Sequence, residues 1–396
     1  MWKINNCFCW SDNWWIEDNN AWFVDGERDV LLKLNFLTNQ CEFIKKIPND
    51  ERKTFRQNPR CIKYHNDIVC LTDIGQCIWI YHCEQFEKIE IKNPNGVRIL
   101  INNFWIFENK LYAVSAGLKQ IIEINVEERR IDNYFDLYDS NIQIAGSVRV
   151  GEKIFIVSSI SNQIYEFDLI TKKTIMHELS EINDKLYAIC FDGDKFWLSG
   201  YNRAIYCWNK DTDSVRILNN FPDEFGIYDF TGESENILDC KKRVYDTPTF
   251  KNIKFVGKYV WFIPFKTNDI LYIGVDTYEI VNLDIKEENE NKHSLLMNSM
   301  AHKYLMMYIR KKRYIGIFSF KNKVVFEIDT VDLQVEIKNY LFSIRYMEEI
   351  SKVVTFNEFY YLDKVMFDHM LQMADLKKSG RHFNNMGLKI YQNLIN

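Results

Sequence analysis

One pattern recurs seven times along the 396-residue chain: short apolar, strand-like runs separated by polar turns. One copy, FDGDKFWLSGYNRAIYCWNKDTDSVRIL, runs from Phe191 to Leu218. The copies align on Trp22, Val69, Tyr112, Phe155, Trp197, Trp261 and Ile315. The intervals between these positions are 47, 43, 43, 42, 64 and 54 residues. A period of this length predicts a repeat architecture, in which each unit buries its apolar face against the next.

Each copy resolves into four strands. In the third copy these are NNFWIFEN, KLYAVSAG, KQIIEINV and RRIDNYFDL, all rich in aromatic and β-branched residues. A four-strand unit repeated every 40–45 residues or so is typical of a β-propeller, whose radial sheets leave only short edges. We therefore expect an all-β fold, a seven-bladed β-propeller of four-stranded blades. A β-sandwich with similar hairpins is the alternative.

A second marker follows the first by 12 to 15 residues in six copies. It is Asp or Asn, with Thr, Glu or Asp three positions later. The pairs are Asn35/Thr38, Asn125/Glu128, Asp168/Thr171, Asn209/Thr212, Asp276/Glu279 and Asp329/Asp332. Such an Asx side chain accepts a hydrogen bond from the backbone two residues on, which closes a tight turn. The second copy departs from the marker, with His82 and Gln85 at these positions.

The stretch KIFIVSSISNQIYEFDLITKKT resembles the strand–turn–strand unit of kelch-like and quinoprotein-like blades. Over residues 1–342 the chain thus resembles the broad superfamily of seven-bladed β-propellers. It lacks the paired glycines of kelch repeats, the Gly-His…Trp-Asp of WD repeats and the tryptophan-docking motif of quinoproteins, so the resemblance implies a fold and no activity. Blade one is expected to begin with the inner strand NCFCWSDNWW, and blade seven to end with LQVEIKNYLF. Both terminal blades are then complete, and the ring is expected to close by packing, without a shared strand.

Residues 343–396 have a different pattern. Five apolar residues follow steps of three and four, as on one face of an amphipathic helix: Phe359, Leu362, Met366, Met370 and Met373. We expect a C-terminal helical extension packed on the propeller as a cap. A Met-rich helix that docks on a partner is the alternative.

Composition and charge limit the partners and the cellular location that we expect for this protein. The net charge is −5, which argues against a nucleic-acid partner. The N-terminus MWKINNCFCWSDNWW does not have the pattern of a signal peptide, and no apolar run is long enough to span a membrane. Of the ten cysteines, Cys70, Cys77, Cys190 and Cys207 lie in strand-like runs, so we interpret the thiols as reduced and the protein as cytoplasmic. The Asn-, Ile- and Lys-rich usage suggests an AT-rich, bacterial source.

The ligand face is expected where the long connections gather. The resemblance implies that loops between blades, and loops between second and third strands, share one face. The long segments are 49–59, 93–101, 136–146 and above all 222–250, an insertion that we expect on this face. The candidate ligand-binding residues there are Arg28, Arg56, Asn58, Arg60, Arg98, Asn102, Tyr201, Arg203, Lys266 and His302. Guanidinium groups suit an anionic or hydroxyl-rich ligand, whereas loop solvation and ion pairing between blades are the structural alternative.

Catalytic motifs are absent from the sequence. It contains no Gly-rich phosphate loop, G-x-S-x-G, H-E-x-x-H or C-x-x-C. Cys7 and Cys9 lie on one face of a strand, but no ligand pair follows at metal spacing, so neither a metal nor a cofactor is expected. The acidic residues of 223–239 are a candidate carboxylate pair or simply a solvated loop.

Three functions remain open. The favoured one is a non-catalytic cytoplasmic scaffold that holds a protein or peptide partner on its loop face. The alternatives are an enzyme, a lyase or one that modifies glycans or peptides, with its site at the mouth of the central channel, and a small-molecule sensor. A deep pocket with converging His and carboxylate groups near Arg98 and Arg203 favours an enzyme, whereas a broad, aromatic-rimmed surface favours a scaffold.

Overall fold

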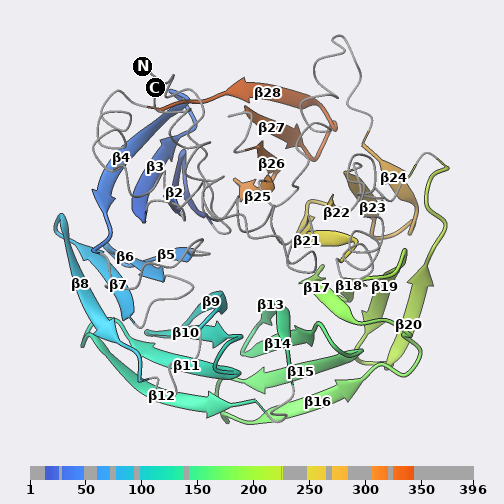
Figure 1. The fold of residues 1–396 in the computed structure, drawn as a ribbon. Helices are drawn as coiled ribbons and strands as arrows, with labels where there is room; N and C mark the ends of the chain where they lie inside the picture. The colour runs from blue at the N-terminus through green and yellow to red at the C-terminus, as the bar shows by residue number, and fades with distance from the viewer. Residues whose placement is uncertain are drawn as a thin grey trace, which may run out of the picture.

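In the computed structural model, seven blades of four antiparallel strands are arranged in a ring, and one of them gains a fifth strand (Figure 1). The structure describes residues 14–25, 29–48, 60–71, 77–92, 99–137, 142–223, 225, 248–264, 270–283, 305–319 and 324–342. No helix occurs in these ranges, so they contain no helix long and apolar enough to cross a membrane. The fold is the seven-bladed β-propeller that the repeat predicted, and a β-sandwich is excluded.

The strands follow one another from the centre of the ring to its rim in every blade. Blade 1 contains β1 (Trp15–Glu17), β2 (Asn20–Asp25), β3 (Val30–Asn35) and β4 (Gln40–Lys46). Blade 2 contains β5 (Arg60–Tyr64), β6 (Asp67–Leu71), β7 (Cys77–His82) and β8 (Gln85–Glu90). Blade 3 contains β9 (Ile101–Phe107), β10 (Lys110–Ser115), β11 (Gln120–Asn125) and β12 (Arg130–Asp136). Blade 4 contains β13 (Ile144–Val150), β14 (Lys153–Ser158), β15 (Gln163–Asp168) and β16 (Thr174–Glu178).

Blade 5 contains β17 (Leu186–Phe191), β18 (Phe196–Gly200), β19 (Ile205–Asn209) and β20 (Ser214–Leu218). Blade 6 contains β21 (Phe250–Val256), β22 (Tyr259–Pro264), β23 (Leu271–Gly274) and β24 (Ile280–Asn282). Blade 7 contains β25 (Leu305–Arg310), β26 (Tyr314–Ser319), β27 (Val324–Asp329) and β28 (Val335–Asn339). The seven aligned positions all lie in second strands, and the four strands quoted for the third copy correspond to β9 to β12, so the predicted units are confirmed.

The hydrophobic core lies between the blades. Trp197 of β18 shares one apolar cluster with Val260 of β22, and Trp261 shares the next cluster with Ile315 of β26. Both tryptophans have no exposed surface. Burying one large apolar side chain contributes roughly 1.5–3 kcal/mol, so each blade is stabilised by its two neighbours.

The predicted Asx turns between third and outer strands are present in five blades. The side-chain oxygen of the marker residue accepts from backbone N–H groups two or three residues on, at Asn35, Asn125, Asp168, Asn209 and Asp329. In blade 6 the prediction for Asp276 was wrong, because Gly274 pairs with Tyr259 at the equivalent position. In blade 2, the turn after His82 uses Cys83 and Glu84, both with positive φ (45° and 61°), as a two-residue hairpin requires.

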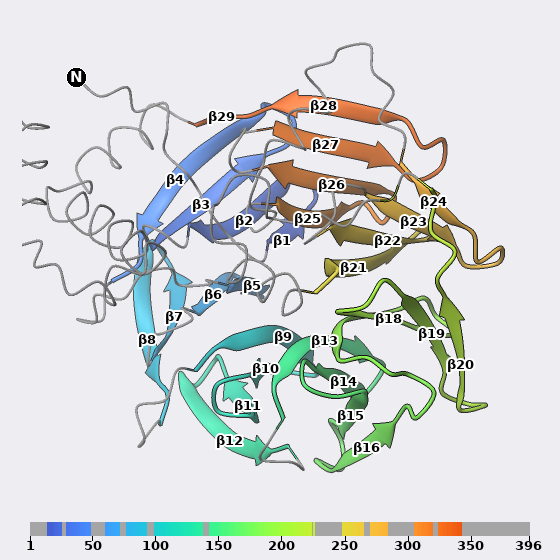
Figure 2. The same ribbon diagram turned by 45° about the vertical axis from the view of Figure 1, so that its right-hand side comes forward.

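The ring closes through a short strand that the sequence did not predict. After blade 7, β29 (Leu341–Phe342) pairs in parallel with β4, with Leu341 opposite Gln40 and Phe342 opposite Cys41 (Figure 2). The expectation of closure without a shared strand was therefore wrong. Packing also joins these blades, because Trp14 stacks on Tyr308 with ring centroids 5.6 Å apart.

Two expected segments lie largely or wholly outside the described residues. Strand β1 begins at Trp15, whereas the expected inner strand NCFCWSDNWW covers 6–15. The helical extension at 343–396 is not described at all, so its existence and its packing stay predictions.

Candidate functional site

Strand direction defines two faces of the ring. The inner strands begin, and the second strands end, on the face that we call the loop face. The turns between first and second strands, and between third and outer strands, lie on the opposite, turn face. Predicted residues Arg60 and Asn102 lie at the start of β5 and β9, and Tyr201 and Arg203 lie between β18 and β19. All four are therefore on the loop face.

The loop-face mouth of the channel is built by a repeated β-bulge. In blades 3 to 6, the register between inner and second strands shifts at the second residue of the inner strand. The bulged residues are Asn102, Ala145, Tyr187 and Lys251. A bulge leaves its residue out of the ladder and re-aims the side chain, a device that is common beside functional sites.

Hydrogen bonds and close backbone contact hold the mouth together. The Asn102 amide donates to the Ala145 carbonyl at 2.5 Å, and the Ser147 hydroxyl donates to Asn102 Oδ1 at 3.1 Å. A Cβ on Gly146 would lie 2.6 Å from the carbonyl oxygen of Tyr187, so only glycine allows the inner strands of blades 4 and 5 to approach this closely. Asn102 is thus a junction residue of the mouth as well as a candidate contact.

Asp184 orders the blade 5 loop. Its carboxylate accepts hydrogen bonds from the backbone N–H of Tyr201 (3.2 Å) and Asn202 (3.0 Å). The hydroxyl of Tyr206 donates to it at 3.1 Å. Burial raises the pKa of Asp184, an effect that these donors oppose. The carboxylate is therefore engaged in shaping the loop.

The ordered loop presents aromatic rings beside cations. Tyr201 meets Tyr187 edge to face, with centroids 6.1 Å apart, and Lys185 Nζ lies 5.7 Å from the Tyr201 ring. The guanidinium of Arg203 lies over two rings, 5.4 Å from Phe221 and 5.2 Å from Phe225. Blade 5 thus forms an aromatic and cationic rim on the loop face.

Deeper in the channel, one level of the ring contains a single charged residue. The inner-strand residues that pair with the seven aligned positions are Trp15, Ile62, Trp105, Val148, Cys190, Lys254 and Ile309. We call this level the Lys254 tier. Burial lowers the pKa of Lys254 below its ordinary value; the neighbouring Cys190 thiol opposes this effect, and the guanidinium of Arg60 adds to it. Arg60 belongs to blade 2 and Lys254 to blade 6, which are not neighbours, so the two cations act on one another across the channel.

Six of the ten predicted residues lie outside the described residues: Arg28, Arg56, Asn58, Arg98, Lys266 and His302. The insertion 222–250 is described only at its two ends and at residue 225. The sequence reasoning missed Tyr187, Lys251 and Lys254 because they lie inside strand-like runs. The alternation of apolar and polar residues along a strand does not reveal a bulge, nor does it reveal a charged residue near the centre of the ring.

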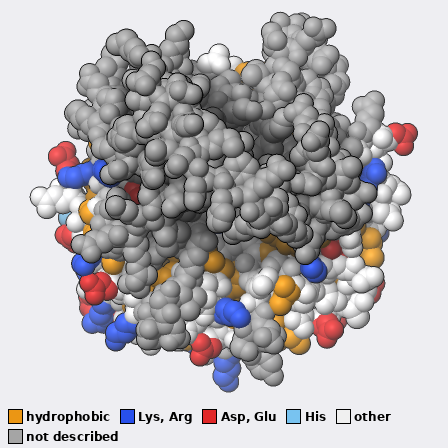
Figure 3. Space-filling model, viewed as in Figure 1, with side chains coloured by type: hydrophobic (Ala, Val, Ile, Leu, Met, Phe, Trp, Pro, Cys, Tyr) orange, Lys and Arg blue, Asp and Glu red, His pale blue; other side chains and the backbone are white. Residues whose placement is uncertain are grey.

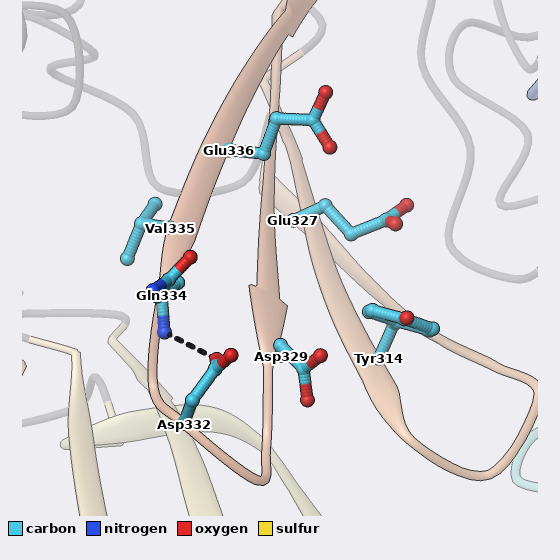
Figure 4. A pocket seen from close by; sticks show the side chains of 7 residues that line it. All are labelled: Tyr314, Glu327, Asp329, Asp332, Gln334, Val335 and Glu336. Atoms are coloured by element: carbon cyan, nitrogen blue, oxygen red, sulfur yellow. Dashed lines mark hydrogen bonds between the residues drawn. The ribbon is translucent and has the colours of Figure 1, made fainter.

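A hollow of about 350 Å³ lies on blade 7, at the turn between its third and outer strands (Figure 4). It is lined by Tyr314, Glu327, Asp329, Asp332, Gln334, Val335 and Glu336. Arg310 pairs with Glu327, Arg313 Nε lies 2.8 Å from Asp329 Oδ1, and Asp332 accepts the Gln334 N–H at 3.0 Å. These carboxylates stabilise the blade, so the hollow is not our candidate site.

Histidines do not converge on the mouth in the described part of the chain. His82 bonds Asp67 on the blade 2 hairpin, and His177 of outer strand β16 bonds Glu166. Nor does any group of three or more His, Cys, Asp or Glu residues within these ranges have metal-binding geometry. Near Arg203 the described residues form the aromatic and cationic rim of blade 5.

The fold defines the class of protein: a seven-bladed β-propeller. No family model matches the chain, and no curated protein matches it. Solved structures share the fold at 9% identity, among them a computationally designed protein, Ika8 (TM-score 0.53; 85% of this chain, 91% of that chain). Another is a catalytically inactive virginiamycin B lyase from Staphylococcus aureus with quinupristin (TM-score 0.57, 9% identity; 81% and 94%). A third is a chain of the mitotic checkpoint complex (TM-score 0.51, 9% identity; 86% and 88%). At this identity the likeness shows the fold alone.

Proposed function

We propose that this chain is a non-catalytic binding propeller that holds a protein or peptide partner against its loop face. The observation that carries the proposal is the rim of blade 5, where Tyr201 and Arg203 lie on a loop fixed by Asp184 and Tyr187 of β17 contacts the Tyr201 ring. Tyrosine and arginine are enriched where binding energy concentrates in protein interfaces. The chain of the mitotic checkpoint complex shows that this fold serves in a multiprotein assembly.

Pre-organisation supports the same function. The Tyr201 and Asn202 amides are held by one carboxylate, and the Thr249 hydroxyl donates to the Asn202 carbonyl at 2.8 Å. A loop fixed before binding loses less conformational entropy when a partner docks. The rim therefore suits a stable contact surface.

Site-specific photo-crosslinking tests this function. The photoreactive residue p-benzoylphenylalanine replaces Tyr201 in one variant, and in the control it replaces Thr212, an exposed residue on the turn face of the same blade. We expect a discrete crosslinked protein from position 201 and none from position 212, identified by mass spectrometry and then confirmed with the purified partner. Equal crosslinking at both positions, or none at 201, contradicts the proposal.

An enzyme remains the second candidate because of Lys254. An amine whose pKa is lowered by burial can act as a base, and the S. aureus lyase has the same fold. Incubation with quinupristin, followed by mass spectrometry, separates the two functions. A binding propeller leaves this peptide unchanged, whereas turnover that Lys254→Met abolishes would establish an enzyme.

We place this function in the cytoplasm, without a nucleic-acid or membrane partner. What supports the setting is that seven described cysteines are free thiols: Cys41, Cys61, Cys70, Cys77, Cys83, Cys190 and Cys207. Reducing compartments keep thiols in this state. Titration of the denatured protein should find ten free thiols, and far fewer would contradict a cytoplasmic setting.

A further inference from the structure

Charge is distributed unevenly over the seven inner strands. They contain six cations, Arg60, Lys63, Arg149, Lys251, Lys254 and Arg310, and one carboxylate, Glu17. The described residues of the loops between second and third strands add two cations, Lys119 and Arg203, and one carboxylate, Asp29. The chain as a whole has a net charge of −5, and side chains of both signs are mixed around the rim of the ring (Figure 3). The described inner strands are thus cationic inside an acidic protein.

Cations on the turn-face side of this channel are neutralised within the protein. Lys63 Nζ lies 2.5 Å from Glu17, and Arg310 pairs with Glu327. Lys254 differs, because it has no ion pair and no hydrogen bond with any described residue. Its side chain is half-buried in an otherwise apolar tier, and a partly desolvated charge without a partner is costly unless a counter-ion neutralises it.

The tier also contains two indole donors that have no partner among the described residues. The indole N–H groups of Trp15 and Trp105 are buried and have no hydrogen-bond acceptor among the described residues. With the ammonium of Lys254, this level of the ring therefore contains three N–H donors, and its side chains offer only one weak acceptor, the sulfur of Cys190. The chemistry that complements such a set is an anion with acceptor oxygens.

We propose that the Lys254 tier receives a side-chain carboxylate from an acidic segment of the partner, which enters through the loop-face mouth. This inference rests on the proposed function and names the chemistry of its partner. A single ammonium in an apolar tier suits one inserted carboxylate, whereas nucleic-acid binding uses a long basic track of phosphate contacts. Lys251 and Arg203 at the mouth attract the rest of the acidic segment.

Fluorescence anisotropy with a labelled hexaglutamate peptide, capped at both ends, tests the proposal. The comparison probes are hexaglutamine with the same label, a uridine hexanucleotide, and glutarate as a free dicarboxylate competitor. The variants are Lys254→Met, which removes the charge, and Lys254→Arg, which retains it. Lys258→Met is the matched control, since Lys258 is exposed on the turn after β21.

We expect hexaglutamate to bind the wild type and hexaglutamine not to bind. Lys254→Met should weaken hexaglutamate binding roughly tenfold or more, because it leaves a desolvated carboxylate unpaired. Lys254→Arg should restore most of the affinity, and Lys258→Met should change nothing. Thermal melting of each variant confirms that it is folded.

Three results overturn the inference: equal affinity in Lys254→Met and wild type, tighter binding of the hexanucleotide, or full competition by glutarate at the peptide's own concentration. Failure to bind hexaglutamate at all also overturns it. The proposed function is judged separately by crosslinking at position 201. If that crosslink persists while Lys254→Met has no effect, the partner exists but does not insert a carboxylate.

Discussion

Lys172 of blade 4 donates from its Nζ to the carboxylate of Glu123 in blade 3, at 2.9 Å, so one ammonium joins two neighbouring sheets. Glu123 is 2% exposed, and it also accepts from Lys110 at 2.6 Å and from the Tyr112 hydroxyl at 2.8 Å. Blade 4 repeats the arrangement, because Lys210 of blade 5 lies 3.1 Å from the buried carboxylate of Glu166. A buried carboxylate with several donors thus fixes the angle between adjacent blades.

The geometry of the turn explains why Lys172 reaches the preceding blade. It has positive φ (60°), four residues after the Asx residue Asp168. Arg129 and Tyr278 occupy the same place in their own turns, with φ of 54° and 59°, and they bond Asp67 and Lys195 of the preceding blade. In blades 3, 4 and 6 the left-handed residue therefore docks its turn on the preceding blade.

Replacing Lys172 by Met should destabilise the protein by about 1–3 kcal/mol, since a buried carboxylate loses a charged donor. The control is Lys173→Met, which changes an exposed neighbour and should cost less than about 0.5 kcal/mol. Urea denaturation gives both free energies of unfolding. Equal values for the two variants would show that the contact between blades does not contribute.

Acid should weaken the same junction. Burial alone would raise the pKa of Glu123, but hydrogen bonds from Lys110, Lys172 and Tyr112 outweigh burial and lower the pKa to about 2. The folded-state pKa is thus below the ordinary value of 4.5, so the stabilisation is present above pH 4.5 and is lost as the pH falls toward 2. In urea unfolding at a series of pH values, Glu123→Gln should reduce this acid dependence, whereas Glu127→Gln, at an exposed site, should leave it unchanged. An unchanged slope in Glu123→Gln would contradict the assignment.

The fold was predictable because neighbouring residues within each repeat determine its strands and turns. Aromatic and β-branched runs mark the strands, and residues such as Asn35 and Asp168 close turns by bonding their own backbone. The marker failed at Asp276, because the turn of blade 6 is set by Gly274, which has no side chain to signal it.

The mouth was predictable only in part. The loops placed Arg60, Asn102, Tyr201 and Arg203 on one face, but the bulges at Tyr187 and Lys251 depend on how each inner strand pairs with the next strand. Lys254 in FKNIKFV reads as one polar residue of an alternating strand. Only closure of the ring sets it among apolar residues at one level of a channel.

Strand β29 was not predictable, because a strand of two residues is too short to show an alternation of apolar and polar side chains. Its contribution follows from comparing two shortened proteins, one ending at Phe342 and one at Tyr340. Losing the pairing with β4 removes ladder hydrogen bonds worth roughly 0.5–1.5 kcal/mol each, so the shorter protein should be less stable by about 1–3 kcal/mol. Urea unfolding measures the difference, and equal stabilities would mean that packing alone closes the ring. Comparison of the longer protein with the full chain tests the expected helical cap.

Asp184 links the fold to the proposed binding surface. Replacing it by Ala should leave the N–H groups of Tyr201 and Asn202 without their acceptor, and so destabilise the protein by about 1–3 kcal/mol. Hydrogen exchange followed by mass spectrometry should then show faster exchange in the peptide that contains these two amides. Asp184→Asn retains one acceptor oxygen and should have a smaller effect.

The control for Asp184 is Asp211→Ala, an exposed residue in the turn-face loop of the same blade. It should leave both stability and exchange near Tyr201 unchanged. Because the rim is ordered by Asp184, we expect Asp184→Ala also to weaken partner crosslinking from position 201, even at temperatures where the blades remain folded. Unaltered exchange and crosslinking in Asp184→Ala would show that the loop is held by other contacts, such as the bond from the Thr249 hydroxyl to the Asn202 carbonyl.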